Sequence, residues 1–177
     1  MTEIRSSPTG LPQGWRIALW GSLLALLLAP LAAMQITSDV AWTPGDFIAA
    51  ALMLIALGAS VELAFRMSGD AMHRAALAAA SLAAFLTFWI NGAVGLIGSE
   101  AQAINLAFYA LVLAAVVASI LAKFRPRAMA IITACMAVSQ LAVGLLAELT
   151  GQPDWGPVLV MTALWALPAA LYRAAAR

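Results

Sequence analysis

Charge is what this sequence has least of. Only 10% of its 177 residues are charged, whereas 64% are hydrophobic, and the mean hydropathy is +0.98. A soluble domain is roughly half apolar and about a quarter charged, so this chain has too few polar residues to cover a core. The composition therefore excludes an ordinary soluble domain and predicts that lipid covers most of the protein.

Cysteine and histidine occur once each, at Cys135 and His73. A lone cysteine cannot form an intramolecular disulfide, and a lone histidine cannot supply a bis-histidine haem or a histidine-rich metal site. The sequence also contains no phosphate-binding glycine loop and no serine–histidine–aspartate set. We therefore expect no cofactor, no metal and no catalytic residue.

Six long apolar segments follow one another along the chain. The first five each approach the roughly 20 residues that a helix needs to cross about 30 Å of hydrocarbon. The sixth is shorter and contains Pro168. No segment alternates with the period of two that transmembrane strands show. The sequence predicts an all-α, polytopic bundle of six transmembrane helices at residues 17–36, 47–65, 75–97, 104–122, 128–147 and 155–172.

The basic residues predict the orientation of these helices. With six crossings and a cytoplasmic N-terminus, all nine fall on the cytoplasmic side of the membrane. The opposite connections, around Asp39, Glu100 and Asp154, carry acids and no base. This is the positive-inside bias, and it predicts cytoplasmic N- and C-termini. The nine residues are Arg5, Arg16, Arg66, Arg74, Lys123, Arg125, Arg127, Arg173 and Arg177.

The predicted organisation has three parts. A cytoplasmic segment covers residues 1–16, the six-helix domain covers 17–172, and a cytoplasmic tail covers 173–177. A signal peptide cleaved near "LAAMQ" is a less favoured alternative, because the residues there fit a cleavage site poorly. The basic loops suit anionic lipid headgroups and are too short to favour nucleic acid, so the bilayer is the expected partner.

Three polar positions inside the predicted helices could be functional: Glu62, Gln140 and Asn91. Glu62 precedes Arg66 by one turn, and an i,i+4 ion pair would satisfy both, although an acid in a membrane helix can also be a functional group. Gln140 lies near the middle of its helix, where we expect an interhelical hydrogen bond. Small residues such as Gly58 are expected to let neighbouring helices approach closely.

The stretch "WINGAVGLIGSEAQAIN" ends the third apolar segment with three glycines and several polar side chains. We predict that the backbone leaves helical geometry around Gly95 and Gly98, since glycine adopts positive φ without strain. Asn91 would then bond the released peptide groups or a neighbouring helix. Glu100 would lie in the turn, and Asn105 would cap the fourth helix.

The first outer loop, "MQITSDVAWTPGDF", contains a helix start. Thr43 is a good N-cap, Pro44 suits the first helical position, and Asp46 suits the third. We predict that the glycine-rich turn packs against this loop. The polar residues of the two loops either manage a tight exit and re-entry of the chain or line a pocket open to the outside. The candidate site consists of Asp39, Trp42, Asn91, Glu100 and Asn105.

These stretches, together with "VELAFR", resemble a group of small, uncharacterised bacterial multi-pass membrane proteins over roughly the first four helices. "AVGLIGSE" carries most of the resemblance. The group has an acid where Ser38 stands, and Asp, Asn and Pro where this chain has Ala101, Gln102 and Ala103. Those departures argue against a fixed metal cage. The resemblance implies a bacterial inner membrane and no particular activity.

Two functions from different classes remain open. The first is a non-catalytic membrane protein, an accessory or partner-binding helical bundle that contacts another membrane protein or a second copy of itself. The second is a small transporter or ligand-binding protein whose site opens outward between the first two outer loops. A membrane enzyme is less favoured, because the sequence offers no nucleophile and only one histidine. Few intramembrane ionisable groups and short loops favour the first.

Overall fold

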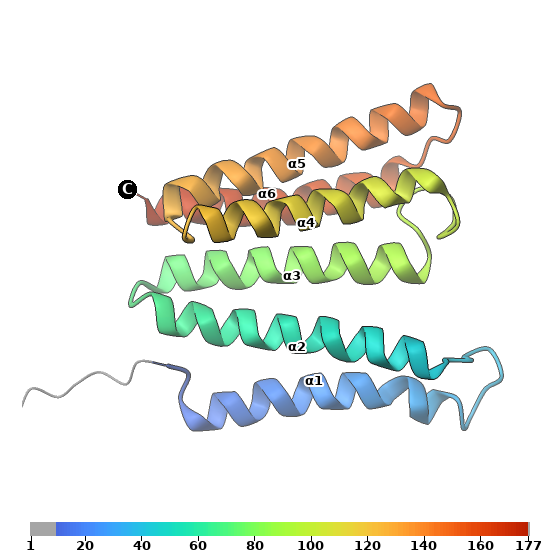
Figure 1. Ribbon diagram of the computed structural model, residues 1–177, viewed down its shortest axis with the longest axis horizontal. Helices are drawn as coiled ribbons and strands as arrows, with labels where there is room; N and C mark the ends of the chain where they lie inside the picture. The colour runs from blue at the N-terminus through green and yellow to red at the C-terminus, as the bar shows by residue number, and fades with distance from the viewer. Residues whose placement is uncertain (1–9, 177) are drawn as a thin grey trace, which may run out of the picture. The chain divides into compact units, whose positions relative to one another are not determined.

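A computed structural model describes residues 10–176, so Arg5 and Arg177 lie outside the described residues. Within that range the chain forms six α-helices, one short 3₁₀ helix and no strand (Figure 1). The predicted six-helix, all-α architecture is confirmed. The elements are α1 (Gln13–Ala33), α2 (Pro44–Met67), α3 (Ala71–Ala93), η1 (Ala103–Asn105), α4 (Leu106–Leu121), α5 (Pro126–Leu149) and α6 (Trp155–Ala175).

Several helix boundaries differ from the predicted segments. The third segment was predicted to run to residue 97, but α3 ends at Ala93. α1 begins at Gln13, within the segment assigned to the N-terminal tail. The sixth segment, the shortest of those predicted, forms a helix of 21 residues that runs through Pro168. At 1.5 Å per residue it is about 30 Å long, which is enough to cross the hydrocarbon.

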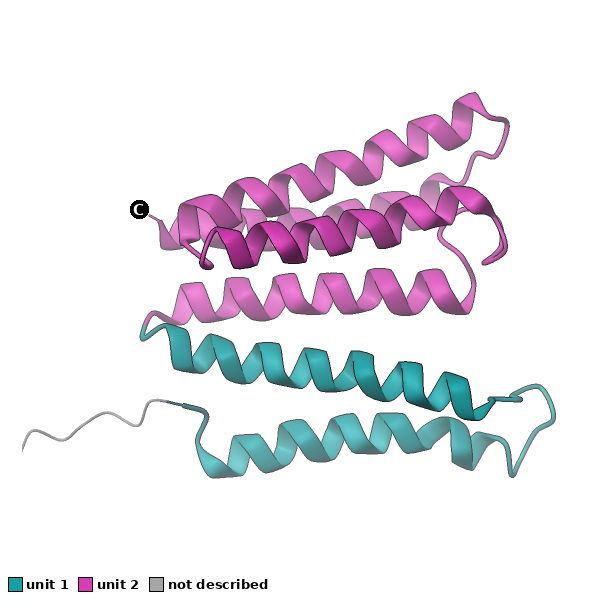
Figure 2. Ribbon diagram, in the orientation of Figure 1, with its two compact units in different colours: residues 1–69 teal, residues 70–177 magenta. Residues whose placement is uncertain are grey.

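Contacts divide the chain into two compact units, Met1–Gly69 and Asp70–Arg177, here called the N-terminal and C-terminal units (Figure 2). In the N-terminal unit, α2 begins with the predicted capping box. The Thr43 hydroxyl accepts a hydrogen bond from Asp46 N, and Thr43 N donates to Asp46 Oδ2 at 2.7 Å. These bonds satisfy backbone N–H groups that a helix start leaves free.

Gly58 lets α1 and α2 pack closely. A β-carbon at this position would lie 2.8 Å from Leu23 Cδ1 and 2.9 Å from Trp20 Cη2. Helices in lipid gain little from hiding apolar surface, so such close contact is what holds them together. The predicted role of Gly58 is confirmed.

Four helices, α3 to α6, form the C-terminal unit. Gly144 on α5 contacts α6, where a β-carbon at Gly144 would lie 2.7 Å from Val158 Cγ1. Two clusters of buried apolar residues form the core. The first contains Leu96, Ile97, Phe108, Val143, Ala147, Val158 and Met161. The second contains Ala83, Val112, Ala115, Met136, Ala137 and Trp165.

Candidate functional site

The backbone leaves helical geometry after α3, as predicted. Gly95 has φ +78° and Gly98 has φ +66°. A β-carbon at Gly95 would lie 2.5 Å from the carbonyl carbon of Ser99, so the chain folds back too tightly there for any side chain. This local reversal turns Leu96 and Ile97 inward, where both are fully buried in the first core cluster.

Asn105 holds this reversal in place. Its Oδ1 accepts hydrogen bonds from Leu96 N at 3.3 Å and Ile97 N at 3.0 Å. Its Nδ2 donates to Ile97 O at 3.0 Å and to Ser99 O at 2.8 Å. Asn105 stands at the N-cap position of α4, as predicted, but it has right-handed helical φ and ψ within η1, and its side chain makes no capping bond. The side chain instead reaches back to the preceding loop.

Asn91 completes the same network from the last turns of α3. Its Nδ2 donates to Asn105 O at 2.9 Å, and its Oδ1 accepts from Leu96 N at 3.2 Å. Asn91 is 1% exposed and Asn105 is 2% exposed. Buried amides must be hydrogen-bonded, and here the backbone of the chain itself supplies the partners. For these two residues the arrangement matches the structural interpretation. We call the pair and the loop they hold, residues 91–105, the asparagine clasp.

Glu100, the third candidate-site residue of the stretch, is exposed. An unpredicted contact lies beside it, where Gly98 N donates to Asp154 Oδ2 at 3.3 Å. Asp154 precedes α6, so this bond ties the clasp to the connection between α5 and α6. The acidic composition of that connection was visible in the sequence, but no local pattern indicated which backbone group it would meet.

Asp39 and Trp42 belong to the N-terminal unit. The Thr37 hydroxyl donates to Asp39 Oδ2 at 3.1 Å, and the Trp42 ring meets Phe47 edge-on with centroids 5.2 Å apart. Within the candidate site, the structure thus brings Asn91 and Asn105 together and places Asp39 and Trp42 in another unit. The contact between the clasp and the first outer loop stays a prediction.

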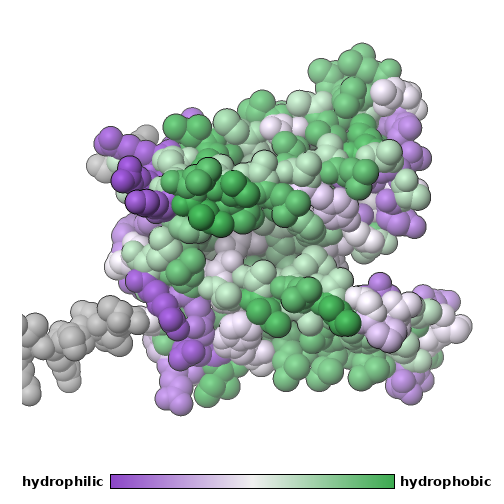
Figure 3. All heavy atoms as spheres, in the orientation of Figure 1, coloured by the Kyte–Doolittle hydropathy of each residue, from purple (hydrophilic) through white to green (hydrophobic). Residues whose placement is uncertain are grey.

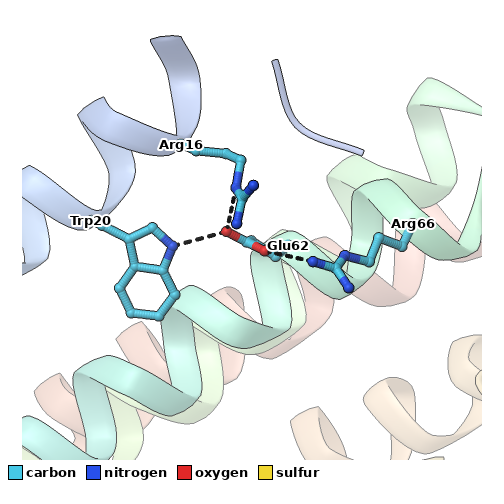
Figure 4. Close-up of polar contacts among 4 residues, drawn as sticks. All are labelled: Arg16, Trp20, Glu62 and Arg66. Atoms are coloured by element: carbon cyan, nitrogen blue, oxygen red, sulfur yellow. Dashed lines mark hydrogen bonds and ion pairs between the residues drawn. The ribbon is translucent and has the colours of Figure 1, made fainter. Parts of the chain in front are cut away.

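A second polar cluster lies in the N-terminal unit around Glu62 (Figure 4). The predicted ion pair is confirmed, since Arg66 Nη2 lies 3.2 Å from Glu62 Oε2. Two residues of α1 add to it: Arg16 Nε and Trp20 Nε1 each donate to Glu62 Oε1 at 2.9 Å. The Glu62 side chain is 13% exposed. The cluster therefore joins α1 to α2 through one carboxylate that two guanidinium groups contact.

Gln140 shows the opposite situation. It is fully buried on α5, yet its Oε1 and Nε2 have no hydrogen-bond partner among the described residues. The predicted interhelical hydrogen bond is wrong. Gln140 shares its helix face with Ala137 and Val143, one from each core cluster, so its surroundings are largely apolar. The nearby hydroxyl of Thr133 donates to its own helix, at Met129 O.

The lone histidine and the lone cysteine occupy different surroundings. His73 lies in the first turn of α3 and packs edge-on against Tyr172, with ring centroids 5.7 Å apart. Cys135 is exposed on α5. Among residues 10–176, no group of three or more His, Cys, Asp or Glu residues is placed to hold a metal ion.

The length and apolar surface of the helices indicate the class of protein. Each helix is long and apolar enough to cross a membrane, with η1 counted as part of α4. Hydrophobic side chains cover the lengths of the helices, and hydrophilic ones gather near the helix ends (Figure 3). The chain is a multi-pass helical membrane protein. Comparisons with protein-family models, curated protein sequences and solved structures found no match, so the resemblance to the bacterial group stays a prediction.

Proposed function

We propose that this protein is a non-catalytic integral membrane protein that acts by binding another membrane protein, as an accessory subunit does. The observation that carries the proposal is the asparagine clasp. Asn91 and Asn105 are buried and bond to the backbone of the clasp itself, which supports a role of their amides in folding in place of an outward pocket. The interpretation as a transporter or ligand-binding protein needed these same groups for its site.

The surface of α1 suits such a partner. Leu23 is the one buried residue of α1 in the described structure. One face of the helix carries exposed apolar side chains at Leu24, Leu28 and Leu31, which are spaced by four and three residues. Residues at this spacing line one side of a helix, and membrane helices associate through such faces by van der Waals packing.

The proposal includes the location and orientation. The basic residues support cytoplasmic N- and C-termini, and the resemblance supports a bacterial inner membrane. Single cysteines at Ser38 and Gln102, in a Cys135→Ala background, should react with an impermeant thiol reagent added outside intact cells. A cysteine at Ser68 should stay unlabelled, and the reverse pattern would contradict this orientation.

Site-specific photo-crosslinking in the native membrane tests the function. A photoreactive amino acid at Leu24 or Leu28 should give one discrete protein adduct, whereas the same group at Leu159 or Val160, on the exposed face of α6, should react mainly with lipid. Lipid adducts alone from every position would contradict the proposal. So would a small molecule that copurifies with the wild type and is lost from a folded Asn91→Ala variant.

A further inference from the structure

The turn between α4 and α5 has an uncommon backbone. Lys123 and Phe124 have φ angles of 52° and 54°, the left-handed region that residues with a side chain rarely adopt. The turn is nevertheless well bonded. Lys123 N donates to Ile120 O at 2.9 Å, Phe124 N to Ser119 O at 3.0 Å, and Arg125 N to Ala122 O at 3.2 Å. Backbone strain of this kind persists where surrounding bonds fix it, and it often marks a functional surface.

The same turn carries two exposed cations, Lys123 and Arg125, and a third, Arg127, follows in the first turn of α5. None of the three forms an ion pair with another described residue. Salt bridges in the described structure join Arg16 and Arg66 to Glu62. No side chain caps the first turn of α5, which begins with Pro126 directly after Arg125. Three cations without an ion pair among the described residues therefore lie together with the positive end of the α5 helix dipole, at the turn and the first turn of the helix.

In the C-terminal unit, cations gather at one end of the helices and most acids lie at the other end. α6 ends where α5 begins, so Arg173 lies at the same end of the unit as the turn (Figure 1). Among the described residues of the unit, the one side-chain carboxylate near this end is Asp70, which caps α3 by accepting from His73 N at 2.7 Å. The other acids, Glu100, Glu148 and Asp154, lie at the opposite helix ends. The described part of the unit therefore places more cations than acids at this end.

We propose that the α4–α5 turn binds the headgroup phosphates of anionic phospholipids. The turn joins two helices that are long enough to span a membrane, so it lies at the depth of the lipid headgroups. Arginine forks match phosphate oxygens with two parallel hydrogen bonds, and basic segments next to membrane helices attract anionic lipids. A soluble phosphate could form the same hydrogen bonds with these cations, but it has no acyl chains to hold it in the membrane.

The experiment uses the full-length protein in neutral detergent, stripped of native lipid and titrated with phosphatidylglycerol or phosphatidylcholine. Native mass spectrometry counts the lipids retained. The wild type should retain phosphatidylglycerol at least about tenfold more strongly than phosphatidylcholine, and added salt should weaken that preference. Replacing all three cations (Lys123→Gln, Arg125→Gln, Arg127→Gln) should reduce phosphatidylglycerol retention about tenfold and leave phosphatidylcholine unchanged.

Two controls separate charge from folding. The charge-keeping set Lys123→Arg, Arg125→Lys and Arg127→Lys should retain most of the phosphatidylglycerol. Should the triple glutamine variant fail to fold, Arg125→Gln is compared with Arg66→Gln, which removes one cation from the Glu62 cluster. Equal losses in these two variants would overturn the proposal, as would equal retention of the two lipids by the wild type. Displacement of phosphatidylglycerol by inorganic phosphate would assign the turn to a soluble anion instead.

Discussion

Asn105 and Gln140 both have amide side chains buried within the C-terminal unit, but they differ in their hydrogen bonding. Asn105 faces a loop whose peptide groups have left the helical pattern, and it makes four hydrogen bonds to them. Gln140 faces intact helices whose peptide groups are already paired, and it makes none among the described residues. A buried amide stabilises a membrane protein where irregular backbone needs partners, and elsewhere it carries an unrecovered desolvation cost.

Among the substitutions considered, replacing Asn105 should lower the stability of the protein most. Asn105→Ala would leave the buried Ile97 N–H and Ile97 carbonyl without their partner, whereas Leu96 N keeps Asn91 Oδ1 and Ser99 O keeps Gln102 N. Each unpaired group costs about 1–3 kcal/mol, so we expect a loss of about 3–5 kcal/mol. Asn91→Ala removes two bonds and should cost about 1–2 kcal/mol. Unfolding in mixed micelles measures both. An Asn105→Ala protein as stable as the wild type would show that the clasp does not hold the loop.

Substitutions at the two positive-φ glycines of the clasp should destabilise the protein by different amounts. Gly95→Ala adds a β-carbon 2.5 Å from backbone and should cost about 2–4 kcal/mol from strain and overpacking. Gly98→Ala is the matched control, because its β-carbon meets the flexible Gln102 side chain at 3.3 Å. Its cost should be about 1 kcal/mol, from the left-handed φ alone. Equal losses in the same unfolding assay would mean that steric crowding at Gly95 is relieved by movement of the loop.

The Gln140 substitution should change stability in the opposite direction. Gln140→Met keeps the side-chain volume and removes the unpaired amide, so we expect a gain of about 1–2 kcal/mol in the free energy of unfolding. Thermal unfolding followed by tryptophan fluorescence measures it. A clear loss of stability would show that Gln140 has a hydrogen-bond partner in the membrane, so that its amide is bonded as that of Asn105 is.

The smallest effect is expected at the Glu62 cluster. Glu62→Gln keeps an acceptor for Trp20 and loses the charge attraction to Arg16 and Arg66, whose side chains are 51% and 62% exposed. Partly exposed pairs contribute about 1 kcal/mol or less, and salt should shrink the difference from wild type. Loss of activity in a normally folded Glu62→Gln protein would instead make Glu62 a working group of the membrane helix.

The sequence predicted those features whose causes are local. The Thr43–Asp46 capping box, the Glu62–Arg66 pair and the break in α3 each depend on residues within one or two turns. Residue type and spacing therefore contained enough information. The helix count followed in the same way, because an apolar run of sufficient length has few alternatives in a membrane.

What the sequence did not predict depends on residues far apart in the chain. Arg16 and Trp20 reach Glu62 across more than 40 positions, and Gly98 meets Asp154 across 56. The sequence predicts that Asn105 caps the helix that follows it, whereas its side chain bonds to peptide groups of the loop before it. Choosing between such partners requires the three-dimensional path of the chain, which residue type does not give.

The clasp also bears on how the chain is made. Its bonds join residues no more than 14 positions apart, so α3 and α4 can be locked together while α5 and α6 are still being synthesised. Leu96 and Ile97 would then already be turned inward when Val158 and Met161 of α6 arrive to cover them. We expect the α3–α4 hairpin to be the earliest protease-resistant piece of the C-terminal unit on the ribosome, with α6 docking onto it last.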